Sequence, residues 1–366
     1  MIKQVSVKNF KNFNEEIVFD LANTRDYKWK DNLVKNNIIN KAIIYGQNNS
    51  GKSNLGAGIM DITTHLSDNL HVNRLYDYYS NGNSIDNDVS FCYEFLFNGK
   101  ILIYKYQKDK TRQLLNEEII YDDKVMYKYN YTNNLYENHF DGLKDIDLSK
   151  RNRDISMLKY LYRSINYLEN DNPLKLLFDF VDHMLWFRSL RENEFLGLMQ
   201  SGENLDEFII KKGLTKEFEK FLKQMGQEYN LIELENMGQK LIGVKYDRMV
   251  APFSQVCSTG TSSLMLFFYW MNHFDNISFL YLDEFDAFYH YELSYNIVKY
   301  ISENDTYQAV LTTHNLNLLD NDLLRPNCYY ILNNGKIKSI DRRTNKTIRE
   351  TQNLEKMFIG GEFTNE

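Results

Sequence analysis

The sequence predicts an α/β fold in which a mixed sheet with flanking helices is joined to an antiparallel sheet and a short helical insertion. Three observations predict it. The apolar run Lys41–Tyr45 is typical of a buried strand, and a glycine-rich loop and a segment of helical character follow it. Between Val89 and Tyr129, segments rich in tyrosine and phenylalanine alternate with period two, as half-buried strands do. From Ile155 to Leu168, apolar residues recur at helical spacing.

The glycine-rich loop is Gly46-Gln47-Asn48-Asn49-Ser50-Gly51-Lys52-Ser53, and it fits the pattern G-x-x-x-x-G-K-[ST] at every specified position. In such loops glycines let backbone N–H groups turn around phosphate oxygens, and the following helix N-terminus adds positive potential. Lys52 is predicted to reach the β and γ oxygens, and the Ser53 hydroxyl to ligate Mg²⁺. A chance glycine-rich turn is the alternative, and the flanking strand and helix argue against it. The loop therefore predicts a nucleoside triphosphate site.

Composition and charge describe a globular chain that is long enough for two or three subdomains. Of its 366 residues, 43% are hydrophobic and 25% are charged. The net charge of -7 disfavours a protein that coats nucleic acid, although it is compatible with a local basic face. Cys92, Cys257 and Cys328 have no metal-type spacing and are expected to be reduced core thiols of a cytoplasmic protein. Since no apolar run reaches about 18 residues and no signal-peptide core is present, no membrane segment is expected.

The chain is expected to divide into an N-terminal lobe of residues 1–146, a mainly helical insertion of residues 147–250 and a C-terminal lobe of residues 251–366. In the first lobe, a helix is predicted over residues 53–66, directly after the loop. Asn98-Gly99 is the strongest hairpin signal in the chain. The predicted strands of this lobe are Ile2–Val7, Glu16–Phe19, Val89–Phe97, Lys100–Gln107, Glu118–Tyr121 and Lys124–Tyr129.

The insertion begins with the helical spacing of Ile155 to Leu168, and Pro173 is predicted to open a second helix that runs through about Phe187. Heptads are not sustained, so a long coiled-coil arm is not expected. The remaining predicted elements are the helices Asn204–Lys212 and Thr215–Met225 and the strands Leu231–Glu235 and Lys240–Asp247.

An acidic strand end is predicted in the last third of the chain. The run Ile277–Leu282 is apolar, and Asp283 and Glu284 follow it directly. Beside a phosphate loop, Asp283 would hold Mg²⁺ through water and Glu284 would polarise the attacking water. The alternative is a buried strand followed by a solvated acidic turn.

Two further segments flank this strand. Cys257-Ser258-Thr259-Gly260 opens a predicted helix that runs through Trp270, and by itself it is better explained as helix-capping chemistry. The β-branched run before His314 predicts a strand that ends in a histidine, and a single histidine is usually structural. The order and spacing of the loop, this helix start, the acidic strand and the histidine together resemble an ABC-type ATPase head.

More specifically, the chain resembles compact ABC ATPases of the RecF/SMC-like group from bacterial anti-phage and abortive-infection systems, such as the ATPase subunits of AbiL, RloA, Septu and PARIS type. The resemblance covers nearly the whole length. The segments that carry it are Val7–Phe13, Tyr45–Gly56, Asp283–His290, Thr312–Asn315 and Asn353–Phe358.

This resemblance implies a role for each matching residue. Ser258 and Gly260 would reach across a dimer interface to the γ-phosphate bound by the other subunit, and His314 would contact the γ-phosphate in its own subunit. The implied cofactors are ATP and Mg²⁺. The implied catalytic residues are Lys52, Glu284 and His314, the metal ligands are Ser53 and Asp283, and the nucleotide-binding residues are Gly46, Asn48, Asn49, Ser50, Gly51, Lys52, Ser53, Asn54, Ser258 and Gly260.

Two motifs depart from the pattern of these ATPases, and the position of a third, the Q-loop glutamine, is not assigned. The usual Leu-Ser-Gly-Gly signature is Cys257-Ser258-Thr259-Gly260 here, and His290 stands at the position of the D-loop aspartate. Both departures bear on the hydrolysis rate more than on ATP binding. Gln107 and Gln113 are the candidates for the Q-loop glutamine, and either is equally compatible with a solvated surface position.

The leading functional hypothesis is an ATP-driven homodimer, or higher homo-oligomer, that senses a phage or nucleic-acid signal. It would control an effector nuclease or toxin subunit encoded nearby, with DNA or RNA as a further partner and no membrane. The alternative is a RecF-like DNA repair or recombination ATPase, which shares every motif. A nuclease in the same chain fits poorly because no carboxylate cluster follows His314, and a transporter ATPase fits poorly because the sheet-rich segment resembles the RecF group.

A basic segment near the C-terminus suggests a contact surface for nucleic acid or an acidic partner. Between Lys336 and Arg349 only Asp341 is acidic. The alternative is a solvated strand pair with ordinary surface lysines and arginines. The basic residues are Lys336, Lys338, Arg342, Arg343, Lys346 and Arg349.

Overall fold

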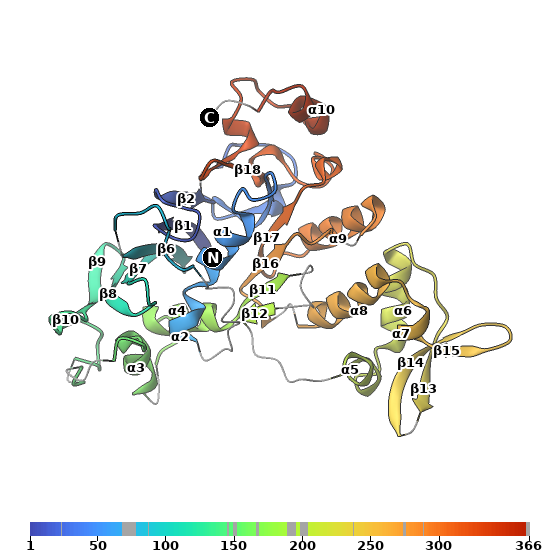
Figure 1. Cartoon of the computed structure of the whole chain (residues 1–366), viewed down its shortest axis with the longest axis horizontal. Coiled ribbons are helices and arrows are strands. Elements are labelled where there is room, and N and C mark those ends of the chain that lie inside the picture. Colours follow the sequence, from blue (N-terminus) through green and yellow to red (C-terminus); the bar gives the residue numbers. More distant parts are fainter. Residues whose placement is uncertain are drawn as a thin grey trace.

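The computed structural model contains two seven-stranded sheets with helices packed between and around them (Figure 1). It describes residues 1–22, 24–67, 78–86, 88–144, 146–148, 152–165, 168–188, 195–197, 204–236, 238–273, 276–287 and 289–363.

The first sheet is antiparallel throughout, in the order β10-β9-β8-β7-β6-β1-β2. Alternate side chains of β6 are buried, which is the pattern that predicted this strand. Asn98 and Gly99 join β6 to β7 with positive φ at both residues, as the predicted hairpin turn requires. The strands are β1 (Ile2–Lys8), β2 (Ile17–Asp20), β6 (Val89–Phe97), β7 (Lys100–Lys108), β8 (Leu114–Tyr121), β9 (Lys124–Asn130) and β10 (Leu135–Asn138).

The second sheet is mixed, in the order β12-β11-β16-β17-β5-β18-β19. Its five inner strands are parallel, and the two edge strands are antiparallel to their neighbours. Strand β17 lies between β5 and β16, so the carboxyl ends of these three strands meet at one edge of the sheet. The strands are β5 (Lys41–Tyr45), β11 (Met184–Arg188), β12 (Phe195–Gly197), β16 (Phe279–Asp283), β17 (Gln308–Thr313), β18 (Tyr329–Asn333) and β19 (Lys336–Ser339).

Helix α1 (Lys52–Met60) lies between the two sheets (Figure 1). Two of its glycines allow this close packing: a Cβ on Gly56 would lie 2.6 Å from the ring of Tyr281, and one on Gly58 would lie 3.1 Å from Val7. The single helix predicted over residues 53–66 is divided after Met60, and α2 (Thr63–Leu66) follows. The carboxylate of Asp61, at the division, accepts hydrogen bonds from Lys108 and from two tyrosines of this core.

In the described part of residues 157–256, pairs of helices alternate with short strands. The helix that begins at Pro173 ends at Asp182, so the prediction that it runs through Phe187 is wrong. Met184–Arg188 instead forms β11, because it pairs in parallel with β16 and its apolar residues Met184–Phe187 are buried in the sheet. The elements are α3 (Met157–Arg163), α4 (Pro173–Asp182), α5 (Leu205–Lys211), α6 (Thr215–Gln224), β13 (Leu231–Asn236), β14 (Gln239–Lys245), β15 (Val250–Pro252) and α7 (Phe253–Val256).

Helices α8 (Thr259–Met271) and α9 (Tyr291–Glu303) lead into and out of β16, and α10 (Leu354–Ile359) lies beyond β18. A short hairpin of β3 (Val34–Lys35) and β4 (Ile38–Ile39) precedes β5. The mixed sheet with flanking helices, the antiparallel sheet and the helical insertion confirm the predicted α/β fold class. Within the described ranges, every helix is too short or too polar to cross a bilayer.

Two sequence expectations are changed by burial. Cys328 is a core thiol as expected, whereas Cys92 and Cys257 are only half-buried; all three are free thiols. One residue of the basic segment is not on the surface: Arg343 is 3% exposed, and Arg342 and Lys346 pair with Asp20 and Glu362. A contact face formed by all six basic residues is therefore not what the structure presents.

Lys41, at the start of β5, is a buried lysine, and its effect on the free energy of unfolding can be measured by changing the pH. It is 1% exposed, its ammonium donates to Tyr307 O and lies 4.5 Å from the centroid of the Tyr307 ring, and burial lowers its pKa to about 7. Between about pH 7 and the pKa of Lys41 in the unfolded chain, the unfolded chain therefore keeps a proton on Lys41 that the folded chain has released. Stability must rise with pH in that window.

We expect the free energy of unfolding to increase by about 1–2 kcal/mol more in the wild type than in Lys41→Met between about pH 7 and about pH 8.5. Urea unfolding of both proteins across this range measures the difference. Equal pH slopes would show that Lys41 keeps its proton when folded.

Candidate functional site

The loop between β5 and α1 folds closely enough that its two glycines cannot carry side chains. A Cβ on Gly46 would collide with Ser50 Oγ and lie 2.8 Å from Leu332 O. Gly51 has φ 104°, in the left-handed region, and a Cβ there would lie 2.5 Å from Asn12 Nδ2. The sequence pattern thus corresponds to a steric requirement at both positions.

Lys52 begins α1 and directs its ammonium toward the loop. Its Nζ lies 2.8 Å from Gly46 O, 3.2 Å from Gln47 O and 3.0 Å from His314 Nε2. Burial lowers the pKa of Lys52, while the nearby carboxylates of Glu284 and Asp283 oppose that shift. The lysine therefore stands in the field of both acidic residues that the sequence singled out.

The two carboxylates at the end of β16 are positioned by a threonine of the neighbouring strand. Thr312 Oγ1 donates to Asp283 Oδ1 at 2.8 Å and accepts from the backbone N–H of Glu284 at 2.7 Å. Asp283 is 3% exposed, and Glu284 has φ 45°. A non-glycine residue in the left-handed region is strained, and here the bond to Thr312 holds it there.

His314 follows β17 and completes the group. Its Nε2 lies 3.7 Å from Glu284 Oε1 as well as 3.0 Å from Lys52 Nζ. Beside it, Thr313 Oγ1 donates at 2.6 Å to Asp286, and burial raises the pKa of this aspartate. Lys52, Glu284 and His314 come from three different strands or their loops, and the sheet order brings them together.

The loop fits the phosphates of a nucleotide. Asn49 and Gly51 have positive φ, a backbone form that turns successive N–H groups to one side, and the nine-residue helix α1 begins at Lys52. Within the described part of the chain, the buried Ser50 Oγ has no hydrogen-bond partner. The hydroxyl of Ser53 and the carboxylate of Asp283 are hard oxygen ligands, the type that Mg²⁺ takes.

One contact to the loop was not indicated by the sequence. Asn54 Nδ2 donates to Asn12 Oδ1 at 2.7 Å, and Asn12 Nδ2 reaches Ser50 O at 3.4 Å. Asn12 lies in the turn between β1 and β2, far from the loop in sequence. No local pattern marks such a residue, because only the packing of the antiparallel sheet on α1 brings it there.

The predicted signature residues lie at the start of α8. Ser258 is exposed, and its Oγ caps the helix by accepting from Thr261 N at 3.1 Å. Among the described contacts, none joins Ser258 or Gly260 to the phosphate loop of the same chain. His290 stands at the N-cap position of α9, and its side chain makes no capping hydrogen bond there.

Both glutamine candidates contact other parts of the molecule. Gln107 bonds to Ser90 and Asn116 on the antiparallel sheet, and Gln113 bonds to Asp154. Neither is brought to the carboxyl ends of the parallel strands by a described contact.

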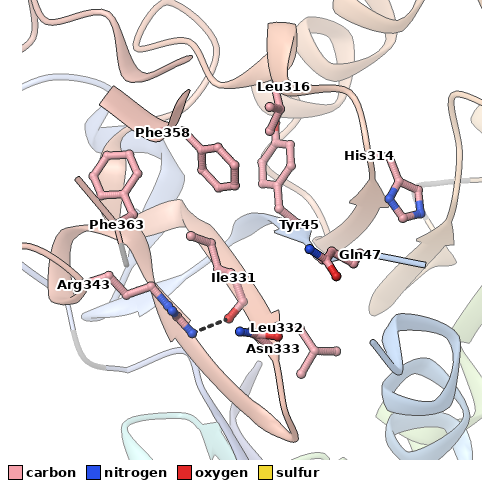
Figure 2. Close-up of a pocket in the computed structure, with 11 residues that line it drawn as sticks. Tyr45, Gln47, His314, Leu316, Ile331, Leu332, Asn333, Arg343, Phe358 and Phe363 are labelled. Atoms are coloured by element: carbon pink, nitrogen blue, oxygen red, sulfur yellow. Dashed lines mark hydrogen bonds between the residues drawn. The ribbon is translucent and has the colours of Figure 1, made fainter. Parts of the chain in front are cut away.

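A pocket of about 420 Å³ opens beside Gly46, Gln47 and His314 (Figure 2). Arg343 lies at its edge and donates to Ile331 O at 3.4 Å. His314 can therefore be reached from this pocket as well as from the loop. Its other lining residues are Tyr45, Leu316, Leu332, Asn333, Phe358 and Phe363.

One family model matches most of the chain. Residues 41–320 match the family AAA_21, described as "AAA domain, putative AbiEii toxin, Type IV TA system". No curated protein matches the sequence.

Several solved structures are similar in fold. The SMC head domain from Thermotoga maritima is 14% identical with a TM-score of 0.48, covering 93% of this chain and 98% of that one. An Smc head domain bound to the C-terminal domain of ScpA, derived from Pyrococcus furiosus, is 15% identical with a TM-score of 0.45 and coverages of 93% and 95%. The recombination mediator RecF with ATP is 12% identical with a TM-score of 0.40 and coverages of 93% and 99%.

Proposed function

This chain belongs to the AAA_21 family of AAA domains, an ATPase family of the AAA/ABC type, and on that premise we propose that it binds and hydrolyses ATP as a dimeric switch. The matched residues, 41–320, include the phosphate loop, the start of α8, the acidic end of β16 and His314. The single observation that carries the proposal is the convergence of Lys52, Glu284 and His314. Each comes from the carboxyl end of a different parallel strand, or from the loop after it.

Each of the three residues has a task that its position supports. Lys52 neutralises charge on the β and γ phosphates, and the loop amides orient them. The Glu284 carboxylate takes the proton of the attacking water, and the Thr312 bond keeps its backbone in place. His314 Nε2, which lies 3.0 Å from Lys52 Nζ, would contact the γ-phosphate. Mg²⁺, held by Ser53 and by Asp283 through water, would supply Lewis-acid neutralisation of the phosphate oxygens.

The exposed start of α8 supports dimerisation. Ser258 and Gly260 make no described contact with the loop of their own chain, and the exposed Ser258 caps the N-terminus of α8, an end of the helix that favours anions. In a two-fold dimer each α8 would complete the site of the other subunit. ATP then lies between the subunits and joins them.

Glu284→Gln, which slows turnover, is expected to form more dimer with Mg²⁺ and ATP than without nucleotide. Adding Ser258→Asp should abolish this gain, because aspartate still caps the helix but repels the partner's phosphates. Sedimentation velocity of the single and double variants measures both. An equal mass for Glu284→Gln with and without ATP contradicts ATP-driven dimerisation.

The biological role that we propose is anti-phage defence, with an effector nuclease or toxin as partner and a phage or nucleic-acid signal as trigger. The support is the family description, which refers to a toxin of a toxin–antitoxin system. Plating phage on cells that carry the locus, with wild-type chain or Lys52→Ala, tests the role. Protection that survives the substitution would contradict an ATP-dependent defence role, whereas no protection by the wild-type chain together with sensitivity to DNA damage on deletion would favour a DNA-repair ATPase instead.

A further inference from the structure

We propose that Tyr281 is a positioning residue that fixes Lys52 relative to Asp283. The inference rests on the proposed function, because it concerns the geometry of the phosphate lysine and the metal carboxylate. Tyr281 is the third residue of β16, is fully buried and lies two residues before Asp283. Residues two apart in a strand share a face, so Tyr281 and Asp283 both face α1.

The phenol is bonded into the first turn of α1. Tyr281 Oη donates to the backbone carbonyl of Lys52 at 2.7 Å. Burial and the charge of Asp283 raise the pKa of Tyr281, and the backbone N–H of Gly56 opposes them by hydrogen bonding to the same oxygen. The Lys52 carbonyl and the Gly56 amide are the two groups that an i to i+4 helical bond would join. The hydroxyl therefore ties the acidic strand to the turn that carries the lysine.

The ring is held as firmly as the hydroxyl. A Cβ on Gly56 would lie 2.6 Å from Tyr281 Cε1, so only glycine lets α1 approach the ring this closely. The indole of Trp186, on β11, packs against the ring edge-on with centroids 6.1 Å apart. The ring is thus enclosed between a helix and a neighbouring strand, and its hydroxyl cannot move without moving one of them.

The bond and packing of Tyr281 fix the distance between Lys52 and Asp283. Lys52 in α1 and Asp283 in β16 are separated by more than two hundred residues of sequence. The local chain around either residue therefore does not set the distance between them. The field of Asp283 acts on both Lys52 and Tyr281, which places the three groups in one neighbourhood. Loss of the phenolic bond should therefore loosen phosphate and metal binding together.

We expect Tyr281→Phe to weaken MgATP binding by about 2- to 12-fold, the effect of one lost hydrogen bond, and to raise the Mg²⁺ concentration needed for half-maximal turnover. Tyr93→Phe is the matched control. Tyr93 is equally buried and its hydroxyl donates at 2.6 Å to Gly58 O of the same helix, but from the antiparallel sheet and beyond the first turn. It should lose comparable stability while its ATP affinity and Mg²⁺ dependence stay at wild-type values.

A second pair of variants tests the ring rather than the hydroxyl. Gly56→Ala must displace the Tyr281 ring and should weaken MgATP binding at least as much, whereas Gly58→Ala meets Val7 at the looser distance of 3.1 Å and serves as control. Isothermal titration with MgATP and with ATP in EDTA, together with Mg²⁺ titrations of turnover, supplies the readouts.

The outcomes separate the inference from the proposed function. A wild-type chain that neither binds nor hydrolyses ATP overturns the proposed function and this inference with it. A wild type that binds ATP, with Tyr281→Phe and Tyr93→Phe equal in affinity and in Mg²⁺ dependence, overturns the positioning role alone and leaves Tyr281 as a packing residue.

Discussion

Glu284→Gln is expected to lower the rate of ATP hydrolysis by about 10²- to 10⁴-fold, the usual contribution of a general base, while ATP binding is retained. Glutamine has the size of glutamate but cannot accept a proton from water. The backbone of residue 284 should not shift, because its N–H is bonded to Thr312 Oγ1 at 2.7 Å independently of the side chain. Removing a negative charge beside the γ-phosphate should also leave ATP affinity equal or higher.

Phosphate release under saturating MgATP and equilibrium binding of ATP measure the two effects separately. Glu292→Gln, an exposed carboxylate in the first turn of α9, is the control and should match the wild type in both assays. If Glu284→Gln hydrolyses ATP at the wild-type rate, the base is another group and the assignment of Glu284 is wrong.

Lys52→Ala is expected to weaken ATP binding itself. Charge-assisted hydrogen bonds contribute about 1.5–3 kcal/mol each, so loss of the ammonium should weaken ATP affinity by at least about 10- to 150-fold. The side chain is 4% exposed and is held by carbonyls of the loop, so no neighbouring cation can move into its place without repacking the loop.

Equilibrium titration with ATP in the presence of Mg²⁺ measures this loss. Lys159→Ala, which removes another partly buried lysine whose Nζ donates to Ser67 O at 2.7 Å, is the control for the general effect of deleting such a residue. Wild-type affinity in Lys52→Ala would contradict the phosphate site. Glu284→Gln and Lys52→Ala must therefore differ: the first keeps ATP affinity and loses turnover, whereas the second loses ATP affinity.

Much of the site could be predicted because each of its motifs lies within a short segment of the sequence. The phosphate loop needs glycine where a Cβ would collide, at Gly46 and Gly51, and a lysine at the helix start. The apolar run before Asp283 and Glu284 and the β-branched run before His314 each predict a strand with a polar end. Once these are parallel neighbours, their carboxyl ends must meet, and the structure brings Lys52, Glu284 and His314 together as that rule requires.

Local pattern also determined the antiparallel sheet, since alternation and the Asn98-Gly99 turn are properties of adjacent residues. The strand β11 could not be found in this way. Its residues follow a helix and are apolar without alternation, and they become a strand only because β16, almost a hundred residues later, offers backbone partners. Long-range pairing overrode local propensity.

The sequence by itself thus predicted which residues would carry the phosphate, the metal and the proton, because those tasks require particular side chains at fixed local spacing. The tertiary structure alone decided what holds them in register: Thr312 between the two carboxylates, Asn12 against the loop, and Tyr281 between the acidic strand and α1. It also buried Arg343 within a segment whose composition suggests a basic surface. Burial and contacts across the two sheets depend on how distant segments pack, and no spacing along the chain encodes them.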